Sequence, residues 1–148
     1  MTQQLWAALS ADGSFNLLYT ASIDEHPADH GCADACDGKE VFPLSREPND
    51  ALGELVGATG AIEFSPDKAA LSLVPLIKSS AAKRIEAFAP IWRQLNDLAD
   101  PQTPDALARR GMIDAVRAWS NNLEQRVLSA TGTIEIEQIL VEIASDTV

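Results

Sequence analysis

The sequence lacks a long hydrophobic run. Its longest apolar stretches, such as LSLVPLI at 71–77, are far shorter than the roughly 20 residues that cross a bilayer. The first residues, MTQQLWAALSADG, lack the basic segment and apolar core of a secretory signal. We therefore expect a cytoplasmic chain with reduced cysteines and no membrane partner. With 148 residues, 46% hydrophobic and 22% charged, the composition is typical of a globular protein about one domain long.

Positive charge is also scarce, and it is unevenly placed. The formal net charge is −11. Residues 1–65 carry eleven acidic and two basic residues, residues 66–130 carry seven and nine, and residues 131–148 carry four and none. The overall field repels nucleic acid and anionic membranes, so we expect neither as a partner. The asymmetry predicts an acidic N-terminal part over 1–65, a middle part over 66–130 and an acidic C-terminal element over 131–148.

Signatures of common active sites are absent from the sequence. It contains no GxSxG, no HExxH and no phosphate-binding glycine loop. The glycines of GELVGATG, at 53, 57 and 60, have the wrong spacing for a dinucleotide fingerprint and are more typical of turns. Cysteine and histidine do lie close together at 24–37, but neighbours in sequence need not be neighbours in a catalytic site. We therefore expect a protein that is not an enzyme.

The chain has two histidines and two cysteines, all within the acidic stretch DEHPADHGCADACD at 24–37. They are His26, His30, Cys32 and Cys36. His-x3-His and Cys-x3-Cys are pairs of zinc-ligand types, which makes zinc one interpretation. The spacing disfavours it, because structural zinc usually joins two separated ligand pairs, and Pro27 and Gly31 prevent one regular helix. The six acidic residues from Asp24 to Glu40 also lack the order of a calcium loop. A solvated acidic loop with two thiols and no cofactor is the alternative that we favour.

The N-terminal part predicts a small antiparallel β element. Two apolar runs flank Asp12-Gly13, a dipeptide suited to a hairpin turn. KEVFPL at 39–44 and AIEF at 61–64 can each add a short strand, whereas NDALGELVG at 49–57 resembles a short capped helix. Residues 22–40 show no sustained periodicity and read as a loop.

The middle part predicts an antiparallel α-helical hairpin, so the expected fold class is α+β. Ser-Pro-Asp at 65–67 and Thr-Pro-Asp at 103–105 are helix-start signals, and LADPQTP is a short connection. The first helix, roughly 66–99, has an apolar stripe at Ile77, Ala81, Ile85, Phe88, Trp92, Leu95 and Ala99. The second, 104–130, has one at Met112, Val116, Trp119, Leu123, Val127 and Ala130. Pro75 and Pro90 should kink or split the first helix, so we expect its continuous part to begin near Leu76. Residues 131–148 fit either a helix or a strand, and we favour a helix.

Part of this hairpin resembles a known family. AAKRIEAFAPIWRQLNDLAD followed by MIDAVRAWSNNLEQRV is similar to a helical segment near the C-termini of phage and prophage tail-associated proteins. The matching positions within 81–127 are Lys83, Arg84, Ile85, Pro90, Trp92, Arg93, Gln94, Asn96, Ile113, Asp114, Ala115, Val116, Arg117, Ser120, Asn121, Leu123 and Glu124. Lys83 stands where a second arginine is common, and Trp119 where a small residue is usual. The resemblance implies a structural or assembly role in a tail, in the host cytoplasm or the virion.

The marked residues of the hairpin are candidates for contacts with protein partners. They are Trp92, Arg93, Asn96, Arg117, Trp119 and Asn121. Tryptophans can anchor an interface, and arginine stems can cover apolar surface beside it. The same residues also fit an ordinary arrangement with tryptophans in the core and polar residues on the wet face. Since 1–65 offers few large apolar side chains to cover the hairpin, we expect a homo-oligomer, first a dimer, held through 76–130 with Trp92 or Trp119 as an anchor.

Overall fold

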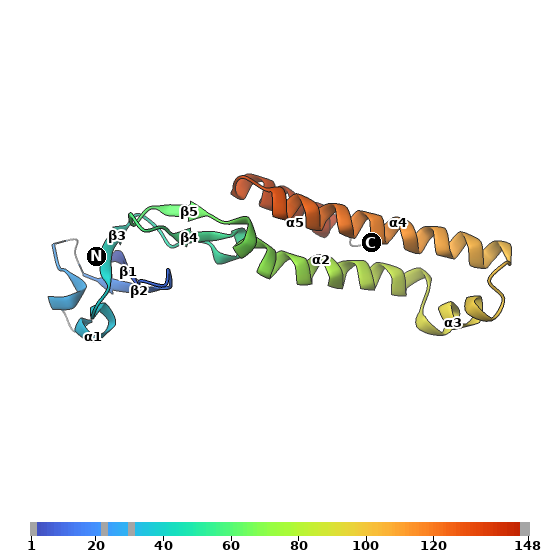
Figure 1. The fold of residues 1–148 in the computed structure, drawn as a ribbon, viewed down its shortest axis with the longest axis horizontal. Coiled ribbons are helices and arrows are strands. Elements are labelled where there is room, and N and C mark those ends of the chain that lie inside the picture. The colour runs from blue at the N-terminus through green and yellow to red at the C-terminus, as the bar shows by residue number, and fades with distance from the viewer. Residues whose placement is uncertain (1–2, 22–23, 30–31, 146–148) are drawn as a thin grey trace. The chain divides into compact units, whose positions relative to one another are not determined.

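The fold is α+β, as the sequence predicted. The computed structural model describes residues 3–21, 24–29 and 32–145. The chain forms two compact units, Met1–Ser65 and Pro66–Val148. The first contains strands β1 (Gln4–Leu9), β2 (Phe15–Thr20), β3 (Glu40–Leu44), β4 (Glu54–Val56) and β5 (Ile62–Phe64), with short helices η1 (Pro27–Asp29), α1 (Ala33–Cys36) and η2 (Asp50–Leu52). The second contains helices α2 (Pro66–Phe88), α3 (Ile91–Ala99), α4 (Pro104–Ser129) and α5 (Thr133–Ser145) (Figure 1).

The first unit is built on an antiparallel sheet with strand order β2-β1-β3. The five consecutive residues LWAAL of the central strand β1 are all buried. Because successive side chains point to opposite faces of a sheet, both faces of β1 are covered. The predicted β1–β2 hairpin is confirmed, but its loop is longer than a two-residue turn, because Leu9 pairs with Phe15. Gly13 supplies the positive φ of +85° in this loop, and Asp12 accepts hydrogen bonds from the Ser14 amide and hydroxyl.

A second, two-stranded sheet pairs β4 with β5. The short helix expected over 49–57 is only half right, since η2 is a single turn and β4 follows it. Asn49 caps η2 by accepting from the Ala51 amide, and Gly53 ends it at φ +81°. The core of the unit brings both sheets together through Leu5, Ala7, Leu44 and Val56.

The second unit is a helical hairpin joined by a third helix. Helix α2 begins at Pro66 and runs through Pro75, so the expected start near Leu76 is wrong. Pro75 removes the hydrogen bond to the carbonyl of Leu71, a residue that is 80% exposed, and water can therefore satisfy that group. Burial of Leu73 and Ile77 on either side of Pro75 holds the helix together.

Pro90 has the stronger effect. It divides the single helix expected over 66–99 into α2 and α3, so the α2–α4 connection contains a helix as well as a short loop. Figure 1 shows α3 at the closed end of the α2–α4 hairpin, whereas α5 returns along the other end. The helix predicted for residues 131–148 is confirmed by α5.

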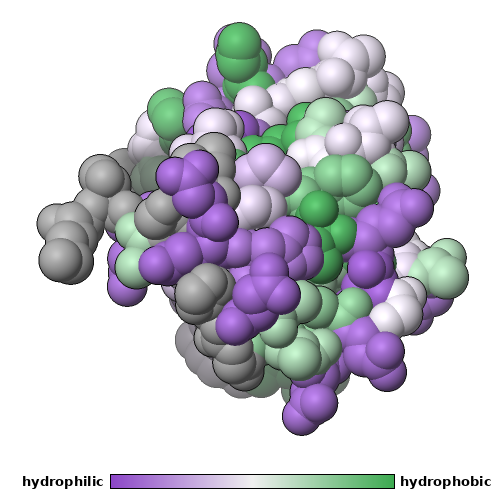
Figure 2. Space-filling view, turned by 90° about the vertical axis from the view of Figure 1, so that its left-hand side faces the viewer, coloured by the Kyte–Doolittle hydropathy of each residue, from purple (hydrophilic) through white to green (hydrophobic). Residues whose placement is uncertain are grey.

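The core of the helical unit lies among α2, α4 and α5. Its largest fully buried side chains are Leu73, Ile77, Leu123, Val127, Ile136 and Ile139. The stripe predicted for α4 is buried at Leu123, Val127 and Ala130 and half-buried at Val116 and Trp119. It fails at Met112, which is 49% exposed, and Ser120 beside the stripe is buried. Ion pairs Lys78–Glu124 and Arg126–Glu142, at 3.8 and 2.6 Å, join α2 to α4 and α4 to α5. Figure 2 is drawn from the side of the first unit, and hydrophilic residues form a broad band there with smaller groups of hydrophobic residues beside it.

Candidate protein-binding surface

The most unusual surface of the helical unit is on α3. Ile91, Trp92, Leu95 and Leu98 are 63%, 56%, 59% and 70% exposed, and we call these four side chains the α3 apolar face. Their spacing of one, four and seven residues puts them on one side of the helix. None of the residues of α3, all of which the structure describes, is buried. A single exposed leucine needs no explanation, whereas four large apolar side chains gathered on nine residues do.

The polar side of α3 explains this orientation. The carboxylate of Asp97 accepts two hydrogen bonds from the Arg109 guanidinium of α4, at 2.7 and 2.5 Å. Gln94 donates through its side-chain nitrogen to the Ala89 carbonyl beyond the end of α2, at 2.6 Å. Asp97 lies about 200° around the helix from Leu95, so a contact between Asp97 and α4 turns Leu95 outward. The helix is thus held by its polar residues with its apolar face in solvent.

The ion pair also sets the protonation of its members. The hydrogen bond from Arg109 lowers the pKa of Asp97, and the nearby charges of Arg93 and Arg110 act in the same direction. Asp97 raises the pKa of Arg109 in return. Both groups therefore stay charged at neutral pH, and the bidentate geometry fixes direction as well as distance.

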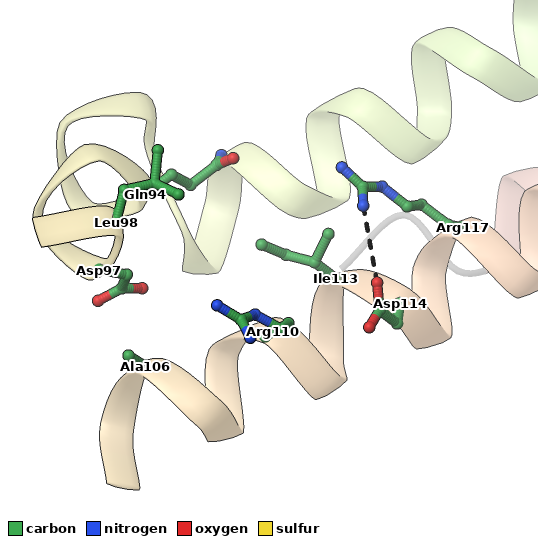
Figure 3. A pocket seen from close by; sticks show the side chains of 8 residues that line it. All are labelled: Gln94, Asp97, Leu98, Ala106, Arg110, Ile113, Asp114 and Arg117. Carbon is green, nitrogen blue, oxygen red and sulfur yellow. Dashed lines mark ion pairs between the residues drawn. The ribbon is translucent and has the colours of Figure 1, made fainter. Parts of the chain in front are cut away.

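A pocket of about 200 Å³ opens between α3 and α4 beside this pair (Figure 3). Side chains of both helices face it: Gln94, Asp97 and Leu98 from α3, and Ala106, Arg110, Ile113, Asp114 and Arg117 from α4. Arg117 pairs with Asp114 at 3.6 Å, one turn away on the same helix. The lining mixes two arginines, two aspartates and apolar groups. Such a mixed lining suits contact with another protein. A binding site for a small ion would instead concentrate charge of one sign.

The six predicted interface residues do not form one patch. Trp92, Arg93 and Asn96 are exposed on α3, and the Arg93 guanidinium carbon lies 5.0 Å from the centre of the Trp92 ring. Arg117 and Asn121 are exposed on α4, further along the hairpin. Trp119 is half-buried, and the guanidinium carbon of Arg84 lies 3.6 Å from the centre of its ring. This contact ties α4 to α2 and gives Trp119 a role inside the hairpin.

The acidic loop gives no assembled metal centre within the described residues. His30 lies outside them, so the complete set His26, His30, Cys32 and Cys36 cannot be compared with a tetrahedron. The described ranges, 3–21, 24–29 and 32–145, contain no group of three or more potential metal ligands. His26 packs edge-on against Trp6 with 5.6 Å between ring centres. Cys36 is buried at the end of α1, and burial raises the pKa of its thiol.

Sequence reasoning missed the contact between Asp97 and Arg109, which determines how α3 faces. The two residues are separated by a helix break and a turn, and neither falls on an apolar stripe. One signal was present: Ile91, Leu95 and Leu98 continue the helical periodicity after Pro90, which marks a separate amphipathic helix. Periodicity identifies an apolar face, but it does not say whether that face is covered.

Among the helices of the described part of the chain, none is both long enough and apolar enough to cross a membrane. Comparison with protein-family models, curated proteins and solved structures finds no match for this chain.

Proposed function

We propose that the chain is a non-enzymatic structural or assembly protein of a phage or prophage tail that acts through protein contacts of its helical hairpin. The observation that carries this proposal is the outward orientation of the α3 apolar face. The bidentate Asp97–Arg109 pair prevents α3 from rolling over to cover that face within its own chain. An apolar surface held open at the end of a hairpin is suited to a partner that covers it.

The assignment to a tail rests on the resemblance of residues 81–127. The matched positions include Trp92 and Arg93 of the exposed helix and Arg117 and Asn121 of α4, all of which are accessible to a partner. These four positions of the motif therefore lie where they can contact another protein. The proposed partners are proteins, including further copies of this chain, and neither a metal nor a cofactor takes part in the proposed role.

Deletion of the gene from a lysogen that carries it tests the role directly. Electron microscopy of induced particles should show absent or malformed tails, and the gene should lie among tail genes. Complementation with Leu95→Asp should fail, whereas Leu71→Asp should restore tails. Both changes place an aspartate at an exposed leucine, 59% and 80% exposed, but Leu71 lies outside the α3 apolar face. Normal tails after deletion would refute the role.

A further inference from the structure

We propose that Cys32 and Cys36 form a reversible oxidation site, at which a hydroperoxide converts the two thiols into a disulfide across one helical turn. This inference concerns the first unit and does not depend on the proposed role in a tail. The chain has two cysteines, and both are free thiols in the structure.

The backbone of α1 brings the two thiols close together. Helix α1 is one turn long, and the Cys36 amide donates a hydrogen bond to the Cys32 carbonyl at 3.1 Å, which is the four-residue spacing of an α-helix. Residues with this spacing have Cα atoms about 6 Å apart, inside the range of about 4.4–6.8 Å found in disulfides. Burial raises the pKa of the Cys36 thiol, and the neighbouring Cys32 thiol raises it further, which agrees with this proximity.

The same geometry makes the disulfide easy to reduce. Cβ atoms four residues apart in a helix are about 5–6 Å apart, whereas a disulfide holds them at about 3.5–4.5 Å. Closing the bond therefore distorts α1. A single turn without a side-chain cap can accommodate this distortion, and Cys32 already lies outside α-helical geometry at φ −106° and ψ 18°. A strained and accessible disulfide is reduced more readily than a structural one, so the bond is reversible.

Burial assigns different steps to the two thiols. Cys32 is half-buried and can meet an oxidant, whereas Cys36 is buried. The Cys32 thiolate attacks the peroxide, the O–O bond breaks, and the leaving oxygen takes a proton, which leaves a sulfenic acid on Cys32. Cys36 then attacks the sulfenic sulfur: the S–S bond forms, the S–O bond breaks, and the hydroxyl leaves as water with the Cys36 proton. Two thiols and one hydroperoxide thus give one disulfide, one alcohol and one water, or two waters from hydrogen peroxide.

The charge of this segment favours a neutral oxidant. Residues 24–40 contain six acidic residues and one basic residue, Lys39. A neutral hydroperoxide approaches without electrostatic repulsion, whereas glutathione disulfide is an anion at neutral pH and is repelled. The site therefore responds to peroxide in preference to the glutathione pool.

Mass spectrometry of the full chain after brief treatment with hydrogen peroxide tests the proposal. Because no lysine or arginine precedes Lys39, trypsin leaves both cysteines on one peptide, residues 1–39. After blocking with iodoacetamide, this peptide should be lighter than the reduced peptide by two hydrogens, carry no alkyl group and recover both thiols with dithiothreitol. Disulfides between chains on a non-reducing gel, or sulfinic acid on Cys32 with Cys36 still open to alkylation, would overturn the proposal.

Single variants separate the two steps. Cys36→Ala keeps an apolar side chain at the buried position and should accumulate a sulfenic acid on Cys32 that dimedone traps. Cys32→Ser should react with peroxide on the order of tenfold more slowly, because its remaining thiol is buried. Far-UV circular dichroism verifies that each variant is folded. Equal rates for the two folded variants would contradict the assigned order of attack.

Two comparisons test the reversibility and the oxidant. Dithiothreitol should reduce the bond in the folded chain at a concentration on the order of tenfold lower than in about 8 M urea, where no helical turn strains it. Oxidation by glutathione disulfide should accelerate roughly threefold when sodium chloride rises from about 50 to 500 mM, whereas oxidation by hydrogen peroxide should not change. A bond that is harder to reduce in the folded chain would refute a reversible site. A rate with glutathione disulfide that does not depend on salt would refute the selection by charge.

Discussion

Truncation of Ile139 to alanine should strongly destabilise the helical unit. Ile139 is fully buried in α5, where α5 packs against α4 and α2. Replacing a buried isoleucine by alanine loses its transfer free energy and leaves a cavity, at a cost of 2–5 kcal/mol in well-packed cores. Because α5 is a terminal helix that can shift towards the cavity, we expect about 3 kcal/mol, in the lower half of that range. For a unit of about 80 residues this lowers Tm by about 12–24 °C.

Thermal and urea denaturation followed by far-UV circular dichroism measure the effect, at low protein concentration so that self-association does not contribute. Ile134→Ala is the matched control, because Ile134 lies in the same helix and is 69% exposed. That variant should stay within about 0.5 kcal/mol of wild type. If Ile139→Ala costs no more than Ile134→Ala, α5 is not packed through this face and the three-helix core is wrong.

The remaining predictions concern the first unit. Glu54 is buried and accepts two hydrogen bonds from Arg46, which lower the pKa of its carboxyl below the ordinary 4.5. The ionised carboxylate therefore stabilises the folded state above pH 4.5, and this stabilisation is lost as the pH falls through the lowered pKa. Urea denaturation from pH 7 to 3 should show the stability gap between wild type and Glu54→Gln narrowing below about pH 4.5, and a gap independent of pH would contradict the assignment. Alkylation with iodoacetamide, read by mass spectrometry, should modify half-exposed Cys32 faster than buried Cys36, whose thiol pKa is raised; equal rates would mean that α1 does not bury Cys36. Purified protein should retain substoichiometric zinc and an unchanged Tm with a chelator, whereas one zinc per chain lost on Cys32→Ser would establish the zinc site.

Local chemistry in the sequence determined where most elements begin and end. Thr103 and Pro104 start α4 at the predicted residue, and the Thr103 side chain accepts from the Ala106 amide. Gly13 marks the β1–β2 loop, and Pro90 ends α2. These signals act through backbone geometry and hydrogen bonds of neighbouring residues, so a single sequence contains them. Pro75 is the exception, because packing of Leu73 and Ile77 holds its helix intact.

The tertiary structure alone decided which apolar faces are covered. The sequence gives α3 the same periodic pattern as α2, and it predicted one continuous stripe through Trp92 and Leu95. In the fold, α2 buries its stripe against α4 and α5, whereas α3 faces the other way, because Asp97 binds Arg109 twelve residues along the chain. Burial depends on contacts between distant residues, and periodicity does not encode them. The candidate surface of this protein is therefore a property of how α3 is held, and the composition of that helix alone does not determine it.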